Sequence, residues 1–264
     1  MQEITSASNP RIKLARKLSR RRAREQAGLC LLEGSRLVMD AWSAGVRFDA
    51  VFITQYLLDQ PEPSPLFSAL EGAGVPLLLV SEALLAEISD TTTPQGIVAL
   101  SHLPERPVPP DPWLVLVLDG VGDPGNAGTL LRSAVAAGVE LVIFGPGTVD
   151  PFGPKVLRAG MGAQFRVAIV VAVTWDEVES ALSGDRICYV ADAQAPLRYD
   201  QVDWNQPAAL VIGSEAQGPS QAALATATSI AIPIVSGVES LNAGMAGSVI
   251  LFEAARQRRT GQSA

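Results

Sequence analysis

The stretch LDGVGDPGNAGTLLRSA, from Leu118 to Ala134, contains the spacing G-x-G-x-x-G at Gly120, Gly122 and Gly125. An apolar run, WLVLVL (Trp113–Leu118), precedes it, and a helical pattern follows. A strand, a glycine-rich turn and a helix in this order are typical of an α/β fold that binds a dinucleotide. The stretch therefore raises the question of which ligand its loop serves.

The residues around the loop argue against a dinucleotide site and hence against a nicotinamide-dependent oxidoreductase. Pro124 and the residues after it predict a helix that begins near Gly128 or Thr129, later than the dinucleotide fold requires. That fold also places an acidic residue at the end of the next strand, and here none follows that strand until Asp150. A phosphate-binding P-loop is excluded as well, because no Lys follows Gly128.

Composition limits the remaining possibilities. The 264 residues suffice for one large or two ordinary domains, and a hydrophobic content of 48% provides a packed core. The longest apolar run, Val167–Val173, is far shorter than the roughly 20 residues of a membrane span. Cys30 and Cys188 show no pairing motif, so we expect a reduced, cytoplasmic setting.

His102 is the only histidine, and it lies in a proline-rich stretch. Zinc enzymes with two or three imidazole ligands are therefore excluded, and we expect no metal site. Nothing near His102 indicates a hydrolase triad, so we interpret it as a solvated linker residue. The chemistry must then depend on carboxylates, Ser, Asn, Arg, backbone dipoles or a cofactor.

Positive charge is concentrated near the N-terminus, although the whole chain carries a net charge of −7. The stretch Ser8–Gly28 predicts one helix, capped by Ser8 or Asn9 and ended by Gly28. Its basic surface is either a solvated face or a phosphate-binding face, and we favour the second because no acidic residue interrupts the stretch from Arg11 to Arg24. The predicted RNA contacts are Arg11, Lys13, Arg16, Lys17, Arg20, Arg21, Arg22 and Arg24.

Two α/β domains are predicted, joined by the linker SHLPERPVPPDP (residues 101–112), whose prolines cannot continue a sheet or helix. Residues 1–100 form the first domain and residues 113–264 the second. Strands alternate with helices in both. The unbroken apolar strands of the second predict a mostly parallel sheet with helices on both faces. Strands of the first domain are expected at Leu29–Leu32, Phe48–Thr54, Pro76–Ser81 and Gly96–Leu100.

Two later stretches change the functional interpretation: LVIGSEAQGPS (Leu210–Ser220) and IPIVSGVESLNAGMAGSVILFEAARQR (Ile232–Arg258). With DPGNAGTLLRSA (Asp123–Ala134) they resemble, in the same order, the three motifs of the TrmH/SpoU family. Members are S-adenosylmethionine-dependent RNA ribose 2′-O-methyltransferases within the SPOUT superfamily. The segment KVLRAGMGAQFRV (Lys155–Val167) resembles the family's stretch between its first and second motifs.

The resemblance covers nearly the whole chain. In the first domain, LLEGSRLV and SDTTTPQGIVAL are similar to an RNA-binding, substrate-recognition domain related in fold to a ribosomal protein. The family implies a C-terminal trefoil knot and a homodimer formed through the knot and the last helix. It also implies an RNA substrate, with ribosomal RNA favoured over transfer RNA by analogy. A non-catalytic RNA-binding protein or ribosome assembly factor is the alternative.

The resemblance also implies residue roles. Arg132, matching the family's catalytic arginine, is either an unusually deprotonated general base or a charged group that binds a phosphate. Four further residues match the family's polar site positions: Asn126, Glu215, Ser240 and Asn242. S-adenosylmethionine is expected in the knot, against backbone groups of Gly213, Gly218, Ile232 and Leu241.

Glycines mark two departures from the family's pattern. Gly160 stands where members usually have Ser, and Ala243-Gly244 stands where they commonly have Val-Ser. Gly244 and Gly247 would each cost about 1 kcal/mol relative to Ala inside a helix. They predict either a poor, partly frayed helix or, as we favour, a surface shared with Ala243 and Ala246 that lets another part of the backbone approach the last helix closely.

Overall fold

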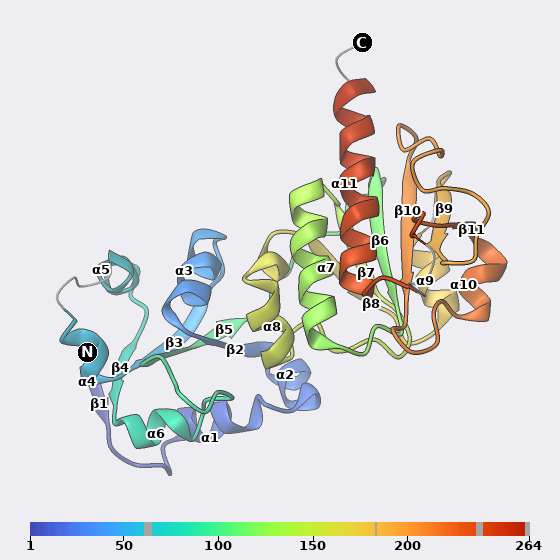
Figure 1. The fold of residues 1–264 in the computed structure, drawn as a ribbon. Coiled ribbons are helices and arrows are strands. Elements are labelled where there is room, and N and C mark those ends of the chain that lie inside the picture. The colour runs from blue at the N-terminus through green and yellow to red at the C-terminus, as the bar shows by residue number, and fades with distance from the viewer. Residues whose placement is uncertain (61–64, 183, 236–239, 262–264) are drawn as a thin grey trace. The chain divides into compact units, whose positions relative to one another are not determined.

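The computed structural model describes residues 1–60, 65–182, 184–235 and 240–261 (Figure 1). The chain forms two compact units, Met1–Glu105 with Phe152–Phe165, and Arg106–Pro151 with Arg166–Ala264. The segment Phe152–Phe165, expected in the second domain, is therefore part of the first unit. Among the described residues, no helix has the length and apolar character needed to cross a membrane.

The first unit contains a mixed sheet in the order β1-β4-β3-β5-β2. β3 is parallel to β4 and antiparallel to β5, which is also antiparallel to β2. The four predicted strands are present, and a fifth, β1, pairs with β4. The strands are β1 (Gln2–Ile4), β2 (Leu29–Glu33), β3 (Phe48–Ile53), β4 (Leu77–Val80) and β5 (Ile97–His102).

Helices cover both faces of this sheet because successive side chains of β3 point to opposite sides. Val51 and Ile53 belong to a buried cluster with α3, α5 and α8, whereas Ala50 and Phe52 belong to a cluster with α1 and α6. These helices are α1 (Pro10–Lys17), α3 (Ser35–Ser43), α5 (Pro65–Gly72), α6 (Glu82–Ala86) and α8 (Pro154–Gly160). The short helix α4 (Gln55–Leu58) follows β3.

The basic N-terminal stretch forms two helices, α1 and α2 (Arg21–Ala27), and the prediction of one continuous helix is wrong. The side chain of Asn9 caps α1, as predicted, and Gly28 ends α2 with a φ of 64°. Between the helices the chain turns, and Leu18 is fully buried. Arg24 is buried as well, and its Nη1 donates to the carbonyl of Leu18 at 2.6 Å. Arg24 therefore stabilises the turn, and its prediction as an RNA contact is wrong.

The second unit contains a sheet in the order β11-β9-β10-β6-β7-β8, in which every pair is parallel. The prediction of an α/β fold with a parallel sheet is thus confirmed. The strands are β6 (Leu114–Asp119), β7 (Leu141–Phe144), β8 (Ala168–Val171), β9 (Ile187–Ala191), β10 (Ala208–Gly213) and β11 (Thr228–Ile230).

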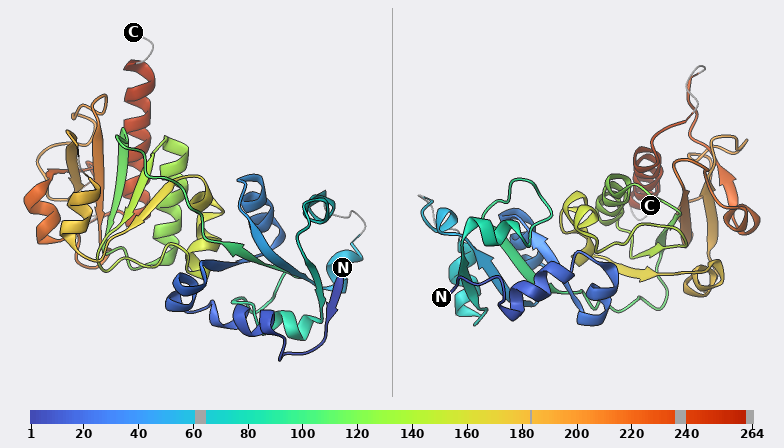
Figure 2. Two further views of the ribbon diagram at one scale, coloured as in Figure 1. Left: turned by 180° about the vertical axis from the view of Figure 1, so that it is seen from behind. Right: turned by 90° about the horizontal axis from the view of Figure 1, so that it is seen from below.

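Helices lie on both faces of this sheet, as Figures 1 and 2 show. α7 (Pro124–Ala137) and α11 (Ala243–Gly261) lie side by side on one face, and α9 (Trp175–Ala181) and α10 (Gln221–Thr226) cover the other. A Cβ on Gly247 would overlap the side chain of Leu130 in α7 and lie 3.2 Å from Ile212 in β10. The atoms nearest to Gly247 belong to side chains, so this glycine makes room for side chains of α7 and β10 rather than for another part of the backbone, as was predicted.

The glycine-rich loop that follows β6 enters α7 earlier than predicted. Asp123 is the N-cap, its Oδ1 accepting from the N–H of Asn126 at 2.8 Å, and Pro124 occupies the first turn. A capping Asp followed by Pro is a strong start signal, so the predicted start near Gly128 or Thr129 is wrong. The absence of an acidic residue at the end of the next strand still argues against a dinucleotide site.

Candidate functional site

A cavity of about 410 Å³ lies at the carboxyl ends of β9, β10 and β11, beside the beginning of α11. Ligands of open α/β sheets bind outside the carboxyl ends of the strands. The cavity brings together most of the residues predicted for the cofactor and the catalytic site. These are Gly213, Glu215, Gly218, Ile232, Ser240, Leu241 and Asn242.

Apolar side chains form much of the remaining wall. Ile212 lies on β10, Ile230 and Ile234 lie on β11 and the segment after it, and Ala246 and Ile250 lie on α11. These residues were not predicted as part of the site, because each also fits an ordinary core position. Only the arrangement of the strands brings them to one cavity.

The loop after β10 folds back on the end of its own strand. Ser214 and Gly218 exchange backbone hydrogen bonds of 3.0 and 2.8 Å. A Cβ on Gly213 would overlap the backbone of Pro219, so this glycine is required by the protein's own loop. The buried carboxylate of Asp119, at the end of β6, accepts from the N–H of Ser220 at 2.7 Å and fixes the far end of the loop. Asp119 was not predicted.

A network of side-chain hydrogen bonds connects the three motifs. Asn126 Nδ2 donates to Glu215 Oε1 at 2.8 Å, and Asn126 Oδ1 accepts from Asn242 Nδ2, also at 2.8 Å. Asn242 Oδ1 in turn accepts from the N–H of Met245 at the start of α11. Asn126 itself is buried. Because one amide bridges the other two residues, the motif loops hold one another in a fixed arrangement.

Glu215 also accepts two backbone hydrogen bonds, from the N–H groups of Gly122 at 3.1 Å and Asp123 at 3.3 Å. Partial burial raises the pKa of this carboxyl and is the largest single effect. The hydrogen bonds from Asn126 and from backbone amides together outweigh it, so the pKa of Glu215 lies below its ordinary value. The carboxylate is thus ionised at neutral pH and serves as an anchor for the loop between β6 and α7.

Arg132 lies apart from this network. It is on α7 with an exposed side chain and does not line the cavity. No residue within the described ranges forms a hydrogen bond or ion pair with its guanidinium. The structure therefore brings Asn126 to the cavity residues but leaves Arg132 outside the cavity of its own chain.

The predicted RNA contacts of the first unit divide into two groups. Arg11, Arg16 and Arg21 pair with acidic side chains of the same unit, those of Asp49, Glu87 and Glu25. The second group consists of exposed cations that pair with no side chain in the described part of the chain. These are Lys13, Lys17, Arg20 and Arg22, which we call the free cations.

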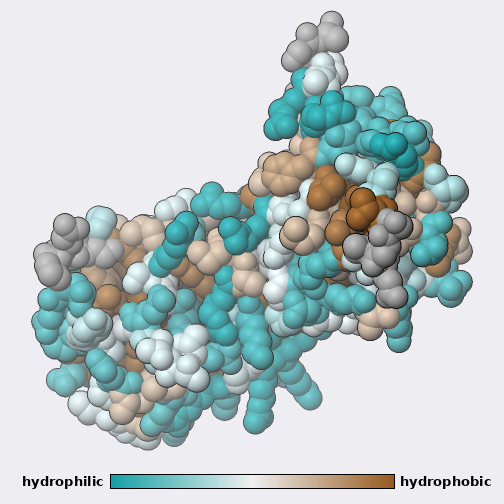
Figure 3. Space-filling view, viewed as in Figure 1, coloured by the Kyte–Doolittle hydropathy of each residue, from teal (hydrophilic) through white to brown (hydrophobic). Residues whose placement is uncertain are grey.

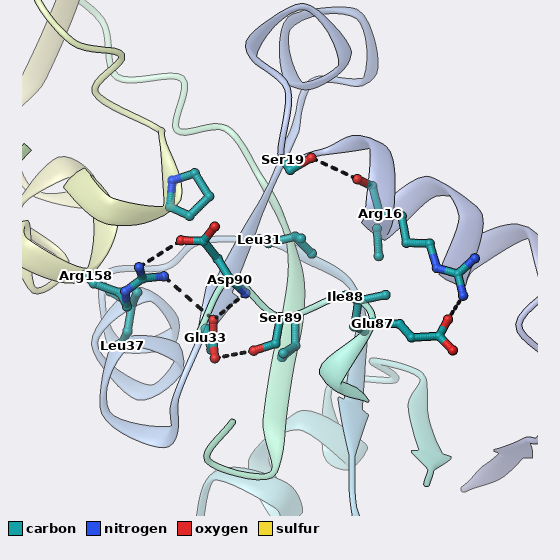
Figure 4. Close-up of a pocket in the computed structure, with 13 residues that line it drawn as sticks. Arg16, Ser19, Leu31, Glu33, Leu37, Glu87, Ile88, Ser89, Asp90 and Arg158 are labelled. Atoms are coloured by element: carbon teal, nitrogen blue, oxygen red, sulfur yellow. Dashed lines mark hydrogen bonds and ion pairs between the residues drawn. The ribbon is translucent and has the colours of Figure 1, made fainter. Parts of the chain in front are cut away.

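A second cavity, of about 250 Å³, lies within the first unit (Figure 4). Glu33 accepts from the hydroxyls of Ser89 and Thr91 and from the N–H of Asp90, the last at 3.1 Å. Arg158 of α8 extends between the two acids and donates to Asp90 Oδ2 at 2.8 Å. Arg158 Nη1, buried 3.7 Å from Glu33 Oε2, has no hydrogen-bond partner among the described residues, but the other polar groups pair with one another. We therefore interpret the cluster as a structural contact rather than a ligand site.

Gly160, one of the departures from the family's pattern, has a local explanation. A Cβ at this position would lie 2.5 Å from Oε1 of Gln164, whose side chain is fully buried and whose Nε2 donates to the carbonyl of Val156. The buried amide therefore occupies the space that a larger residue would need. As for metals, the described residues contain no group of three His, Cys, Asp or Glu that could hold an ion.

Comparisons with known proteins agree with this geometry. Residues 113–252 match the model of the SpoU rRNA Methylase family, and residues 9–99 match an MRM3-like substrate binding domain. Mitochondrial rRNA methyltransferase 3 of Mus musculus is 36% identical, covering 89% of this chain and 69% of its own. The Bacillus subtilis 23S rRNA (guanosine(2553)-2′-O)-methyltransferase RlmP is 31% identical, covering 96% of this chain and 98% of its own.

Solved structures are similar over nearly the full length. A crystal structure of an RNA 2′-O ribose methyltransferase has a TM-score of 0.81 and 34% identity, covering 98% of this chain and 100% of its own. The AdoMet-bound rRNA methyltransferase from Sinorhizobium meliloti has a TM-score of 0.82 and 28% identity, covering 97% of each chain.

Proposed function

The chain belongs to the SpoU rRNA methylase family, and from that membership we propose that it transfers a methyl group from S-adenosylmethionine to a ribose 2′-hydroxyl of ribosomal RNA. The observation that carries this proposal is the network of Glu215, Asn126 and Asn242 beside an apolar cavity. The relatives named above as rRNA and 23S rRNA 2′-O-methyltransferases support the substrate.

The cavity fits an adenosine-containing cofactor. Its isoleucine walls suit the faces of a purine, and backbone groups at Gly213, Ile232 and Leu241 suit its polar edge. The AdoMet-bound relative supports the same assignment. When bound, S-adenosylmethionine supplies a methyl group activated by a sulfonium.

The protein's own task is to orient the ribose hydroxyl and assist loss of its proton. Ser240 and Asn242 stand at the mouth of the cavity and bind the ribose. Arg132 acts as a cation and binds the phosphate beside the target ribose through two N–H donors. The alternative role, a general base, requires deprotonation of the guanidinium.

The catalytic unit forms a homodimer through α11, with the C-terminal segments threaded into a trefoil knot. Supporting this, α11 exposes Met245, Val249 and Phe252 at spacings of four and three residues, and Leu241, two residues before the helix begins, is exposed as well. Figure 3 shows hydrophobic side chains gathered over this part of α11. Since Arg132 lies outside the cavity of its own chain, it acts at the cavity of the partner subunit.

The first unit, residues 1–100 of the predicted organisation, recognises the RNA. Its fold related to a ribosomal protein is inferred from the resemblance, and the match to an MRM3-like substrate binding domain supports the role. The free cations supply phosphate contacts. Ribosomal RNA is favoured over transfer RNA, and the cytoplasmic setting stays a prediction.

Incubation with methyl-labelled S-adenosylmethionine and either ribosomal or transfer RNA tests the proposal. We expect label in ribosomal RNA, recovered as a 2′-O-methylnucleoside, and loss of at least a hundredfold in rate for Arg132→Ala, of the order expected for removing a positioned catalytic donor. Arg166→Ala, another exposed arginine of the same unit, is the matched control and should retain activity. Tight RNA binding without any methyl transfer would favour the non-catalytic alternative.

A further inference from the structure

Asp192 is a carboxylate of the cavity to which no role has been given. It directly follows β9 and lines the cavity. Its N–H donates to the carbonyl of Ile230 in β11 at 2.9 Å, and its Oδ1 accepts from the N–H of Gln194 at 3.0 Å. Contacts on both sides thus hold the carboxylate at the carboxyl edge of the sheet.

Asp192 keeps one oxygen without a hydrogen bond from any described residue, whereas Glu215, another carboxylate that lines the cavity, uses both of its oxygens. Glu215 uses both oxygens to hold Asn126 and two backbone amides. Asp192 uses Oδ1 for its own turn, and in the described residues neither a hydrogen-bond donor nor a cation engages Oδ2. A half-buried carboxylate that lines a cavity and has one unengaged oxygen is suited to a ligand that donates hydrogen bonds.

We propose that Asp192 binds the 2′- and 3′-hydroxyls of the cofactor's ribose. The proposal rests on the proposed function and adds a residue that determines adenosine recognition. An acidic residue at the carboxyl end of a strand holds ribose hydroxyls in dinucleotide-binding folds. In this chain no acidic residue directly follows β7, but Asp192 directly follows β9.

The position of β9 assigns the contact to the ribose rather than to the reacting end of the cofactor. β10 separates β9 from β6, and neighbouring strands are about 4.8 Å apart, so β9 lies about 10 Å from the strand that leads to Asn126. Asn126 belongs to the network that we place at the methyl-transfer end. Asp192 therefore faces a more distant part of the cofactor, where the vicinal diol offers two donors to one carboxylate.

Equilibrium binding by calorimetry tests the proposal with two ligands. S-adenosylhomocysteine carries adenosine and an amino-acid tail, whereas 5′-methylthioadenosine carries adenosine without the tail. The variant Asp192→Asn keeps an Oδ1 acceptor for Gln194, so the turn is preserved. Asp203→Asn is the matched control, because Asp203 accepts from the N–H of Asn205 in the same kind of turn but does not line the cavity.

We expect Asp192→Asn to weaken both ligands about tenfold or more, and Asp203→Asn to leave both affinities unchanged. Unchanged affinities for Asp192→Asn, or a loss confined to S-adenosylhomocysteine, would overturn the assignment to the diol. In addition, the 2′,3′-dideoxy form of 5′-methylthioadenosine should bind the wild-type protein at least about tenfold more weakly than its parent, and equal binding would overturn the proposal. If the wild-type protein bound no S-adenosylhomocysteine, the proposed function itself would fail.

Discussion

Glu215 joins the loop after β10 to the loop before α7, since it accepts hydrogen bonds from the N–H groups of Gly122 and Asp123 and from Asn126. The carboxylate is needed in its charged form, because only an ionised carboxylate accepts at both oxygens without placing a proton among donors. A single ionisation therefore controls whether two of the three motifs stay together.

The stability of the protein should depend on pH through this carboxyl. Its folded pKa lies below the ordinary value of 4.5, so its stabilising contribution is complete above that value and is lost as pH falls through the lowered folded pKa. Thermal melting of the wild type and of Glu215→Gln between pH 7 and pH 3 measures the effect. The wild type should melt higher at pH 7, with the difference shrinking below pH 4.5. A difference that is constant with pH would contradict this role.

At the scale of elements, the contact of α11 with α7 depends on glycine. Gly247→Ala should lower the free energy of unfolding by about 1 kcal/mol. Overpacking destabilises by about 1–3 kcal/mol, whereas the higher helix propensity of Ala stabilises by about 1 kcal/mol. Gly72→Ala in α5 is the control, since a Cβ there meets nothing within 4 Å. It should raise stability by about 0.5–1 kcal/mol. Urea denaturation of both variants is the measurement, and equal signs would refute the packing argument.

The helices α1 and α2 carry two kinds of cation: exposed ones that are proposed to contact RNA, and the buried Arg24, which stabilises the fold. Replacing Lys17 or Arg20 by Ala should lower the slope of log K against log salt by roughly 0.7–0.9 each, as expected for one lost phosphate contact. Arg24→Ala should leave that slope unchanged and lower the melting temperature, because Arg24 is buried against Leu18. Fluorescence anisotropy with ribosomal RNA at several salt concentrations measures the slopes. An unchanged slope for both surface variants would place RNA binding elsewhere.

Much at this scale was predictable from sequence, because periodicity and turn residues act locally. Nearby residues predict the apolar strands of the parallel sheet, the start of α1 after Asn9 and the end of α2 before Gly28. The break between α1 and α2 does not, since it depends on burying Leu18. Likewise, Asp119 and Asp192 acquire a place in the site only through strands that the topology makes neighbours.

At the scale of the whole molecule, the position of Arg132 outside its own cavity makes the dimer part of the catalytic account. If Arg132 acts at the partner's cavity, mixed dimers of Arg132→Ala and Ser240→Ala contain one site with both defects and one intact site. Co-expression of the two inactive variants, purified through different tags, should therefore restore a substantial part of wild-type methyl transfer. No restoration in verified mixed dimers would indicate that each arginine serves its own cavity.

The central claim, ribose methylation of ribosomal RNA by this site, is tested most directly by mapping 2′-O-methyl groups across total RNA of cells with and without the protein. The account predicts that a ribosomal RNA ribose loses its methyl group in the deletion strain. The wild-type protein should restore that group, and Arg132→Ala should not. Identical methylation maps with and without the protein, or full restoration by Arg132→Ala, would contradict the account.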